Sequence, residues 1–289
     1  MAQSWLQLSI RTSAANIDAL SNVVIERGSP GVVLKRNGLE AFFPSSRNNG
    51  SLRREVGRSI FRIARLNPRA SDPRLQWKVV KQENWEQSWK RFIKPRRVGR
   101  SFWVTPPWLK PPKFRRRHVI TIDPGMAFGT GTHATTRGCI EFLEVVADKL
   151  GGNKFTALDI GTGSGILAIA LAMLGATEIW AIDNDPVAVK VARENLRVNG
   201  VVKKVHASGT ELSAFRQTFP VVVANLTAET ILDLAMALEK RGAPKGFMVL
   251  SGILQQKAAA VIRRFQSRFR VIRRARQREW VTLLLQRRK

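Results

Sequence analysis

A glycine-rich loop, GTGSG at residues 161–165, directly follows an apolar run and holds the strongest chemical signal in the chain. Glycine lets the backbone pass close to a ligand, and the start of a following helix offers unpaired amide groups. Gly161, Gly163 and Gly165 have the spacing G-x-G-x-G, which differs from the G-x-G-x-x-G of dinucleotide sites. No lysine follows these glycines, so a phosphate-cradling P-loop is excluded. Asp159, just ahead of the loop, would repel a pyrophosphate but can accept a hydrogen bond from an ammonium group or a ribose hydroxyl.

Two further polar side chains end predicted strands near this loop. Asp183 ends the second strand, 18 residues after Gly165, where a carboxylate can accept hydrogen bonds from both hydroxyls of a ribose. Asn225 ends the fourth strand. Asp185 precedes Pro186 and is interpreted as a helix N-cap rather than a ligand contact. The loop, Asp183 and Asn225 together predict a site for an adenosyl-bearing cofactor.

The segment DPGMAFGTGTHATT at residues 123–136 is dense in Gly and Thr. Its glycines make it flexible, so it could fold over a bound cofactor and exclude water. We assign Thr132 to cofactor binding, and Phe128 and Thr130 to substrate contact. His133 is a candidate general base because the reference pKa of histidine is about 6.5, although it could instead cap the next helix or line the loop. The alternative interpretation of the whole segment is an ordinary loop with a capping threonine.

These residues must be positioned by the alternating elements of the chain. Residues 4–81 show the order β-α-β-β-α-β, with a strong hairpin signal at Asn37-Gly38. The predicted strands are 4–11, 31–36, 39–44 and 76–81, and the predicted helices are 14–27 and 53–66. This order is ferredoxin-like and predicts a small α+β domain over residues 1–82.

A regular β-α alternation follows in the second half, which predicts a Rossmann-like α/β domain over residues 119–289 with a parallel sheet covered on both faces. The predicted strands are 155–160, 178–183, 204–207, 221–225, 247–251, 269–274 and 280–286, and the helices are 165–174, 186–199, 228–240 and 254–268. Because the last two strands have no helix between them, we expect an antiparallel edge. The proline-rich segment 83–118 is predicted to be a linker with one short helix, Trp85–Phe92.

The net charge of +28 is distributed unevenly. Residues 1–118 hold 25 Lys and Arg against 7 Asp and Glu, residues 119–246 hold 12 against 13, and residues 247–289 hold 12 against 1. The functional interpretation is a pair of basic flanks suited to an acidic partner such as ribosomal RNA. The alternative is a solvated surface on a generally basic protein.

Composition excludes several classes of protein. Cys139 is the only cysteine and there are three histidines, so neither an internal disulfide nor a cysteine or histidine metal site is expected. No stretch approaches 18 uninterrupted apolar residues, and no signal-peptide run opens the sequence. We therefore expect a cytoplasmic protein that does not span a membrane, and nothing in the sequence demands more than a monomer.

The motifs together resemble the PrmA family, whose members methylate large-subunit ribosomal protein L-eleven. The resemblance covers most of the chain and rests on residues 123–136, LDIGTGSGILAIA at 158–170, AIDNDPVAV at 181–189, WEQSWKRFIKPRRVG at 85–99, VTPPW at 104–108 and LSGIL at 250–254. It implies a ferredoxin-like substrate-recognition domain, a linker and a seven-stranded class I methyltransferase domain. It also implies methylation of lysine side chains and an α-amino group with S-adenosylmethionine as the cofactor.

We assign cofactor binding to Thr132, Asp159, Gly161, Gly163, Asp183 and Asn225. Some positions depart from the usual family pattern: Thr162 stands where cysteine is common, and Pro220 stands where an aspartate usually precedes the fourth strand. Our hypothesis for catalysis is that the side-chain oxygen of Asn225 accepts a hydrogen bond from the substrate amine and orients its lone pair.

Two other functions stay open. An RNA or DNA amino-methyltransferase would suit the basic flanks, but such enzymes commonly carry N/D-P-P-Y/F at the fourth strand. The sequence at 225–228 is NLTA, which lacks the prolines and the aromatic ring that would stack on an extruded base. A non-catalytic RNA-binding assembly factor is the other alternative, and the intact cofactor motifs disfavour it.

Overall fold

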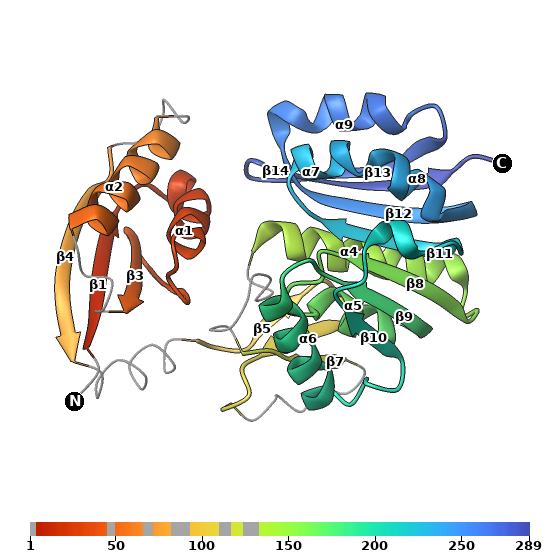
Figure 1. Ribbon diagram of the computed structural model, residues 1–289, viewed down its shortest axis with the longest axis horizontal. Helices are drawn as coiled ribbons and strands as arrows, with labels where there is room; N and C mark the ends of the chain where they lie inside the picture. Colours follow the sequence, from red (N-terminus) through yellow and green to blue (C-terminus); the bar gives the residue numbers. More distant parts are fainter. Residues whose placement is uncertain (1–3, 45–49, 66–71, 82–92, 110–116, 124–132) are drawn as a thin grey trace. The chain divides into compact units, whose positions relative to one another are not determined.

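The computed structural model describes residues 4–44, 50–65, 72–81, 93–109, 117–123 and 133–289. The chain divides into two compact units, residues 1–94 and 95–289, whose elements are labelled in Figure 1.

The first unit has the ferredoxin-like order predicted from the sequence. Its elements are β1 (Ser4–Arg11), α1 (Ile17–Glu26), β2 (Val32–Lys35), β3 (Gly38–Pro44), α2 (Gly50–Ala64) and β4 (Arg74–Lys81). The strands form an antiparallel sheet in the order β2-β3-β1-β4. Leu6, Leu8 and Ile10 alternate along β1 and are buried against the two helices, so one face of the sheet carries the core. The β2–β3 turn requires glycine at Gly38, because a Cβ there would lie 1.9 Å from the Ile10 carbonyl oxygen.

The second unit contains the seven-stranded sheet. Its strands are β8 (Phe155–Ile160), β9 (Ala176–Ile182), β10 (Val205–Ser208), β11 (Phe219–Asn225), β12 (Gly242–Leu254), β13 (Phe269–Gln277) and β14 (Trp280–Arg287). The order is β10-β9-β8-β11-β12-β14-β13, and only the pairings of β14 with β12 and β13 are antiparallel. The predicted antiparallel edge is therefore confirmed.

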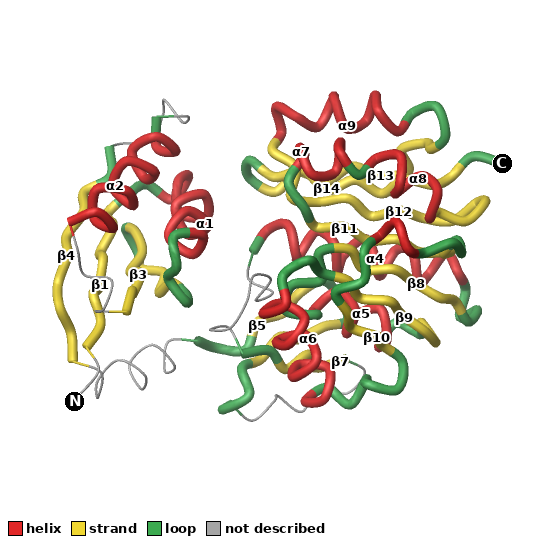
Figure 2. The backbone as a smooth tube through the Cα atoms, in the orientation of Figure 1, coloured by secondary structure: helices red, strands yellow, loops and turns green. Residues whose placement is uncertain are grey.

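Helices cover both faces of this sheet (Figure 2). They are α4 (Ala134–Leu150), α5 (Ile166–Met173), α6 (Pro186–Val198), α7 (Ala228–Asp233), α8 (Ala235–Arg241) and α9 (Ala258–Phe265). The core beneath α4, α5 and α6 and the core beneath α7, α8 and α9 contain alternate residues of the same strands. Residues 221–224 of β11 are all buried, because a central parallel strand has helices on both sides. No helix within the described ranges is long and apolar enough to cross a membrane.

A small third sheet corrects the predicted linker. The strands β5 (Arg96–Val98), β6 (Phe102–Thr105) and β7 (His118–Thr121) pair in the order β5-β6-β7, and β5 and β6 lie within the stretch 83–118 that the sequence assigned to the linker. Strands of three or four residues are too short to show an alternation of apolar and polar residues. They form here because neighbouring strands pair with them. The predicted helix Trp85–Phe92 lies entirely outside the described residues.

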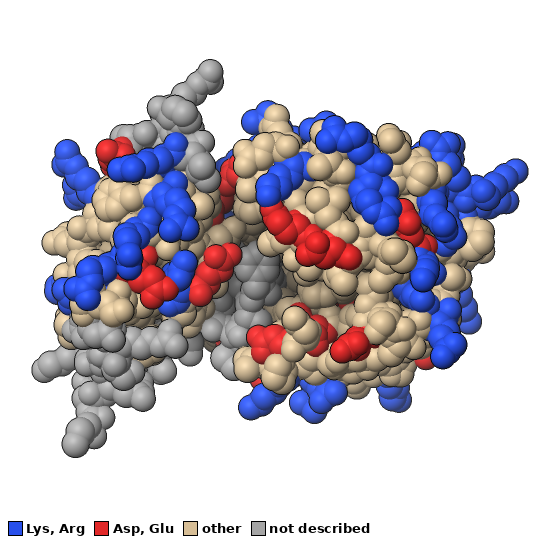
Figure 3. Space-filling view, turned by 45° about the horizontal axis from the view of Figure 1, so that its top comes forward, with Lys and Arg blue, Asp and Glu red and all other residues tan. Residues whose placement is uncertain are grey.

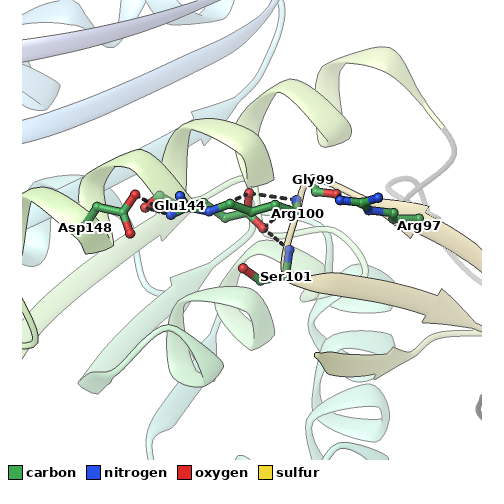
Figure 4. A network of polar contacts seen from close by, with 6 residues as sticks. All are labelled: Arg97, Gly99, Arg100, Ser101, Glu144 and Asp148. Carbon is green, nitrogen blue, oxygen red and sulfur yellow. Dashed lines mark hydrogen bonds and ion pairs between the residues drawn. The ribbon is translucent and has the colours of Figure 1, made fainter. Parts of the chain in front are cut away.

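The β5–β6 turn is attached to α4 by a buried carboxylate (Figure 4). Glu144 accepts hydrogen bonds from the backbone amides of Arg100 and Ser101, the latter at 2.7 Å. The Arg100 guanidinium also pairs with Asp148, one turn further along α4. Gly99 sits at φ +59°, and a Cβ there would lie 2.7 Å from the Glu144 carboxylate oxygens. These contacts make residues 95–105 part of the second unit.

Candidate cofactor site at the carboxyl ends of the central strands

The candidate site lies where β8 and β11 are neighbours in the sheet. From β8 the chain continues to β9 and β10 on one side, and from β11 it continues to β12 on the other. Ligands of open α/β sheets bind at the carboxyl ends of the strands at such a switch point. The predicted cofactor residues Asp159, Gly161, Asp183 and Asn225 lie at or directly after these strand ends, so the fold brings them to one edge.

The glycine loop adopts a backbone conformation that favours glycine at three positions. Gly161, Gly163 and Gly165 have φ of +69°, +53° and +81°, a region that side chains with a Cβ rarely occupy. The amides of Gly161 and Thr162 both donate to the Ile182 carbonyl oxygen, at 2.9 and 3.0 Å, which attaches the loop to β9. Gly165 is the N-cap of α5, so the loop presents a helix N-terminus without a capping side chain.

The Asp183 carboxylate is fixed by the backbone on both sides. Its Oδ2 accepts from the Gly163 amide at 2.9 Å, and its Oδ1 accepts from the Asp185 amide at 3.0 Å. A carboxylate offers about four acceptor positions, so both oxygens can still accept from a ligand. Asp185 accepts from the Val187 amide at 2.8 Å and caps α6, as predicted from its place before Pro186.

Asp159 is fully buried at the end of β8. The pKa of its carboxyl is raised to about 7, mainly by burial and also by the neighbouring Asp183 charge, although the hydroxyl of Thr162, which donates to Oδ2 at 2.7 Å, lowers it. A cation bound beside this carboxyl would favour its charged form. This environment suits the ammonium contact that the sequence suggested for Asp159.

Asn225 presents a buried acceptor at the end of β11. Its Oδ1 is shielded from solvent and has no hydrogen-bond donor among the described residues. A buried polar atom without a partner costs about 1–3 kcal/mol. Such an atom at the ligand edge of the sheet is explained most directly by a donor on a bound molecule.

Leu226 holds this end of β11, a role that the sequence did not reveal. A Cβ on Gly161 would lie 2.3 Å from Leu226 Cδ2, and a Cβ on Gly252 would lie 2.2 Å from the Leu226 carbonyl oxygen. Leu226 is thus packed between the glycine loop and the end of β12, where Gly252 has φ +81°. The available signal was the glycine of the LSGIL segment, but only tertiary packing shows what it contacts.

His133 occupies the N-cap of α4. Its Nδ1 accepts from the Thr135 amide at 3.3 Å and lies 2.7 Å from the Thr135 hydroxyl, and its ring packs edge-on against Trp280 at 5.3 Å between centroids. These contacts support the role of His133 as a helix cap. Its role as a general base stays a prediction. Thr132, Phe128 and Thr130 lie outside the described residues.

These residues fit an adenosyl cofactor that carries an ammonium group. The fit rests on the buried Oδ1 of Asp159, which has no hydrogen-bond partner among the described residues, on the backbone-held carboxylate of Asp183 and on the glycine loop at a helix N-terminus.

Comparison with known proteins decides the family. The PrmA family, described as ribosomal protein L11 methyltransferase, matches residues 4–288. The chain belongs to this family. A protein of Pelobacter propionicus called ribosomal protein L11 methyltransferase is 37% identical over 307 aligned positions that cover 99% of both chains. One of the same description from Citrifermentans bemidjiense is 38% identical over 303 positions and covers 98% of both.

A solved structure of a related protein supports the fold. The crystal structure of a ribosomal protein L11 methylase from Lactobacillus delbrueckii subsp. bulgaricus is 28% identical, covers 67% of this chain and 97% of that chain, and gives a TM-score of 0.59. The seven-stranded PrmA domain described above is therefore a class I methyltransferase domain, and its cofactor is S-adenosylmethionine. The expected family, fold and cofactor are confirmed.

Proposed function

We propose that this PrmA family member transfers methyl groups to lysine side chains and an α-amino group of ribosomal protein L11, and that Asn225 orients the accepting amine. The names of its relatives and the family match support the substrate. The observation that carries the assignment to Asn225 is its buried Oδ1, which lacks a donor among the described residues.

S-adenosylmethionine, when bound, supplies a methyl group attached to a sulfonium. The amine attacks the methyl carbon in line with the sulfur, which is the leaving group. The protein must then hold a neutral amine with its lone pair directed at that methyl group. A lysine amine has a reference pKa of about 10.4, so its deprotonation at pH 7 costs roughly 4–5 kcal/mol. The Asn225 oxygen would accept one N–H of the amine, which fixes the direction of the lone pair without itself removing a proton.

The cofactor-binding roles follow from the contacts of the strand ends. Asp183, held by the amides of Gly163 and Asp185, would accept the ribose hydroxyls. Asp159 would accept the ammonium of the methionine part, and Gly161 and Gly163 would let the backbone approach it. Thr132 is proposed to bind the cofactor, and Phe128 and Thr130 to contact the substrate, on the basis of the sequence alone.

His133 has a structural role that competes with base catalysis. Because its Nδ1 is engaged at the N-cap of α4, the imidazole is well suited to fix the start of this helix next to the segment 123–132. Water can remove the proton of the amine, so the account does not require His133 as a base. If the pH dependence of activity changed when His133 was replaced, His133 would again be the candidate general base.

The organisation proposed around this site follows the sequence. The first unit would recognise the substrate, and the enzyme would act as a cytoplasmic monomer. Sedimentation velocity of the purified chain tests the monomer, and a sedimentation coefficient that rises with concentration would contradict it.

The experiment that tests the function is incubation with methyl-labelled S-adenosylmethionine and either free L11 or undermethylated ribosomes, followed by mass spectrometry. Label on L11 amines supports the proposal. Label that nuclease removes and protease does not would indicate a nucleic-acid methyltransferase. No label in either substrate, with cofactor binding intact, would indicate a non-catalytic factor.

A further inference from the structure

An arginine-rich surface at the far edge of the seven-stranded sheet has no part in the cofactor site. We define the arginine edge as the exposed basic residues from the end of α9 through β13 to the C-terminus. They are Arg263, Arg268, Arg270, Arg273, Arg274, Arg276, Arg278, Arg288 and Lys289. The one acidic residue between positions 247 and 289 is Glu279. Figure 3 shows Lys and Arg gathered along the margin of the second unit near α9 and the C-terminus.

The register of β13 places these arginines on both faces of an edge strand. Arg274 pairs with Leu283 and Arg276 with Val281, whose side chains belong to the core under α7, α8 and α9. Arg273 instead pairs with Leu284 on the opposite face, where its guanidinium lies 5.8 Å from the Phe142 ring centroid. The strand therefore presents guanidinium groups on either side of its free edge.

Few acidic groups neutralise this charge. Glu239 pairs with Arg264 at 2.9 Å and with Arg268 at 3.7 Å. Arg270 donates to the amide oxygen of Gln286, and Arg276 donates to the carbonyl oxygen of Arg278, so neither finds a carboxylate among the described residues. Arg274 likewise has no ion pair within the described part of the chain. Arg270, Arg274 and Arg276 therefore keep their positive charge without a carboxylate partner in the described part of the chain.

Protection of an edge strand does not account for this composition. Charged side chains, lysine above all, prevent pairing of exposed edges, and one or a few suffice. β13 instead carries four arginines and no lysine in nine residues. The guanidinium differs from the ammonium in its planar fork of donors, which matches a phosphate in two-point contact.

We propose that the arginine edge binds the phosphate backbone of RNA. A polyanion with regularly spaced phosphates complements the exposed guanidinium groups of Arg270, Arg274 and Arg276, whereas a substrate that presents lysine amines would be repelled by them. Between residues 263 and 289, which are all described, no aromatic ring is fully exposed for stacking on bases: Phe265 and Phe269 are buried and Trp280 is half-buried. The binding is therefore independent of sequence and depends steeply on salt.

The test measures binding of a fluorescein-labelled 30-nucleotide RNA of mixed sequence by fluorescence anisotropy, without cofactor, across about 50 to 300 mM salt. The variant is R270Q/R274Q/R276Q. The control is K190Q/R197Q/K203Q, which removes the same charge from exposed positions on and after α6. Neither variant touches the cofactor site, so methylation of free L11 and the thermal melting temperature report whether each remains folded.

We expect the edge variant to bind the RNA at least about tenfold more weakly at low salt, with the slope of log affinity against log salt reduced by about 2, because each phosphate contact contributes about 0.7. The control should keep the slope. Equal loss in both variants, or loss in neither, would overturn the proposal, because the charge would then act without a defined surface. The proposal would also be overturned if the wild type bound poly-glutamate as tightly as RNA and the edge variant lost that binding too. An acidic protein would then be the better candidate partner.

Discussion

Two regions of the seven-stranded sheet are built in opposite ways. One is the cofactor edge, formed by the carboxyl ends of β8, β9 and β11, and the other is the arginine edge at β13. At the cofactor edge, the carboxylates are individually held: Asp183 by two backbone amides, and Asp159 by burial and the hydroxyl of Thr162. At the arginine edge, many charges are exposed, and Arg270 and Arg276 bind an amide or carbonyl oxygen rather than a carboxylate. A site that aligns atoms needs individually held groups, whereas a surface that attracts a polyanion needs only their sum. Single substitutions should therefore have large effects at the first edge and small effects at the second.

The largest effect is expected for Gly252→Ala. Its Cβ would meet the backbone oxygen of Leu226 at 2.2 Å, and the residue has φ +81°. We expect the free energy of unfolding to fall by about 3–5 kcal/mol, combining the left-handed penalty with overpacking. Gly152→Ala is the matched control, because Gly152 has φ +80° with nothing within 4 Å and should lose only about 1–2 kcal/mol. Equal losses in urea denaturation would show that Leu226 does not hold this edge.

The next effect concerns cofactor affinity. Asp183→Asn removes the charge of an acceptor that the backbone holds in place, and we expect the dissociation constant of S-adenosylmethionine to rise about 10- to 100-fold. Asp185→Asn keeps a good N-cap acceptor and should change affinity by less than about twofold. Isothermal titration calorimetry measures both. Equal affinities for the two variants would contradict the assignment of Asp183 to the ribose.

The pH dependence of cofactor binding tests Asp159. Its pKa in the free folded protein is about 7, and a bound ammonium favours the carboxylate, so binding below pH 7 must expel a proton. Affinity should fall by up to about tenfold per pH unit below pH 7 and level off above pH 8. Asp159→Asn should remove this dependence.

Thr162→Val sharpens the same test. The Thr162 hydroxyl lowers the pKa of Asp159, so its loss should move the midpoint of the affinity curve to higher pH. The same raised pKa affects the stability of the ligand-free protein. Compared with Asp159→Asn, the free energy of unfolding of the wild type should be highest at low pH and should fall as pH rises from about 4 through 7. A midpoint that moves to lower pH would contradict the account.

A smaller effect is expected at His133. Asn is a strong N-cap residue, so His133→Asn keeps an acceptor for the Thr135 amide while it removes the imidazole. We expect kcat to stay within about threefold and its pH profile to keep its shape, because water can serve as the proton acceptor. A lost acidic limb in the pH profile would assign base catalysis to His133.

The smallest effects are expected for single substitutions on the arginine edge. Arg274→Gln alone should weaken RNA binding by less than about threefold at 150 mM salt, because each phosphate contact contributes a small, additive increment. Anisotropy titrations measure this. A tenfold loss from Arg274→Gln alone would mean that this edge, like the cofactor edge, depends on an individually positioned group.

The sequence predicted the elements that have strong local signals. The bounds of β1 and β8 agree with prediction at both ends, because each strand is a pattern of apolar residues ended by polar or glycine residues. The cap at Asp185 was predicted from its proline neighbour. The predicted helix 228–240 is instead two helices that meet at Leu234, and no glycine or proline marks that break.

Features that depend on tertiary contacts could not be predicted. The short strands β5 and β6 form because β6 pairs with both β5 and β7, and because Glu144 binds the β5–β6 turn from 43 or 44 residues away. The packing of Leu226 between Gly161 and Gly252 joins three segments far apart in sequence. For the site itself, sequence spacing identified the polar groups, and the fold supplied their hydrogen-bond partners.

The most direct test of the central claim compares Asn225→Ala with Asn184→Ala, an exposed asparagine next to Asp183, in methylation of free L11 followed by mass spectrometry. The account predicts that Asn225→Ala lowers kcat about 100-fold, since a misaligned amine attacks poorly, while S-adenosylmethionine still binds and Asn184→Ala stays near the wild-type rate. An Asn225→Ala enzyme that methylates the same L11 amines at the wild-type rate, with cofactor bound, would show that Asn225 does not orient the amine.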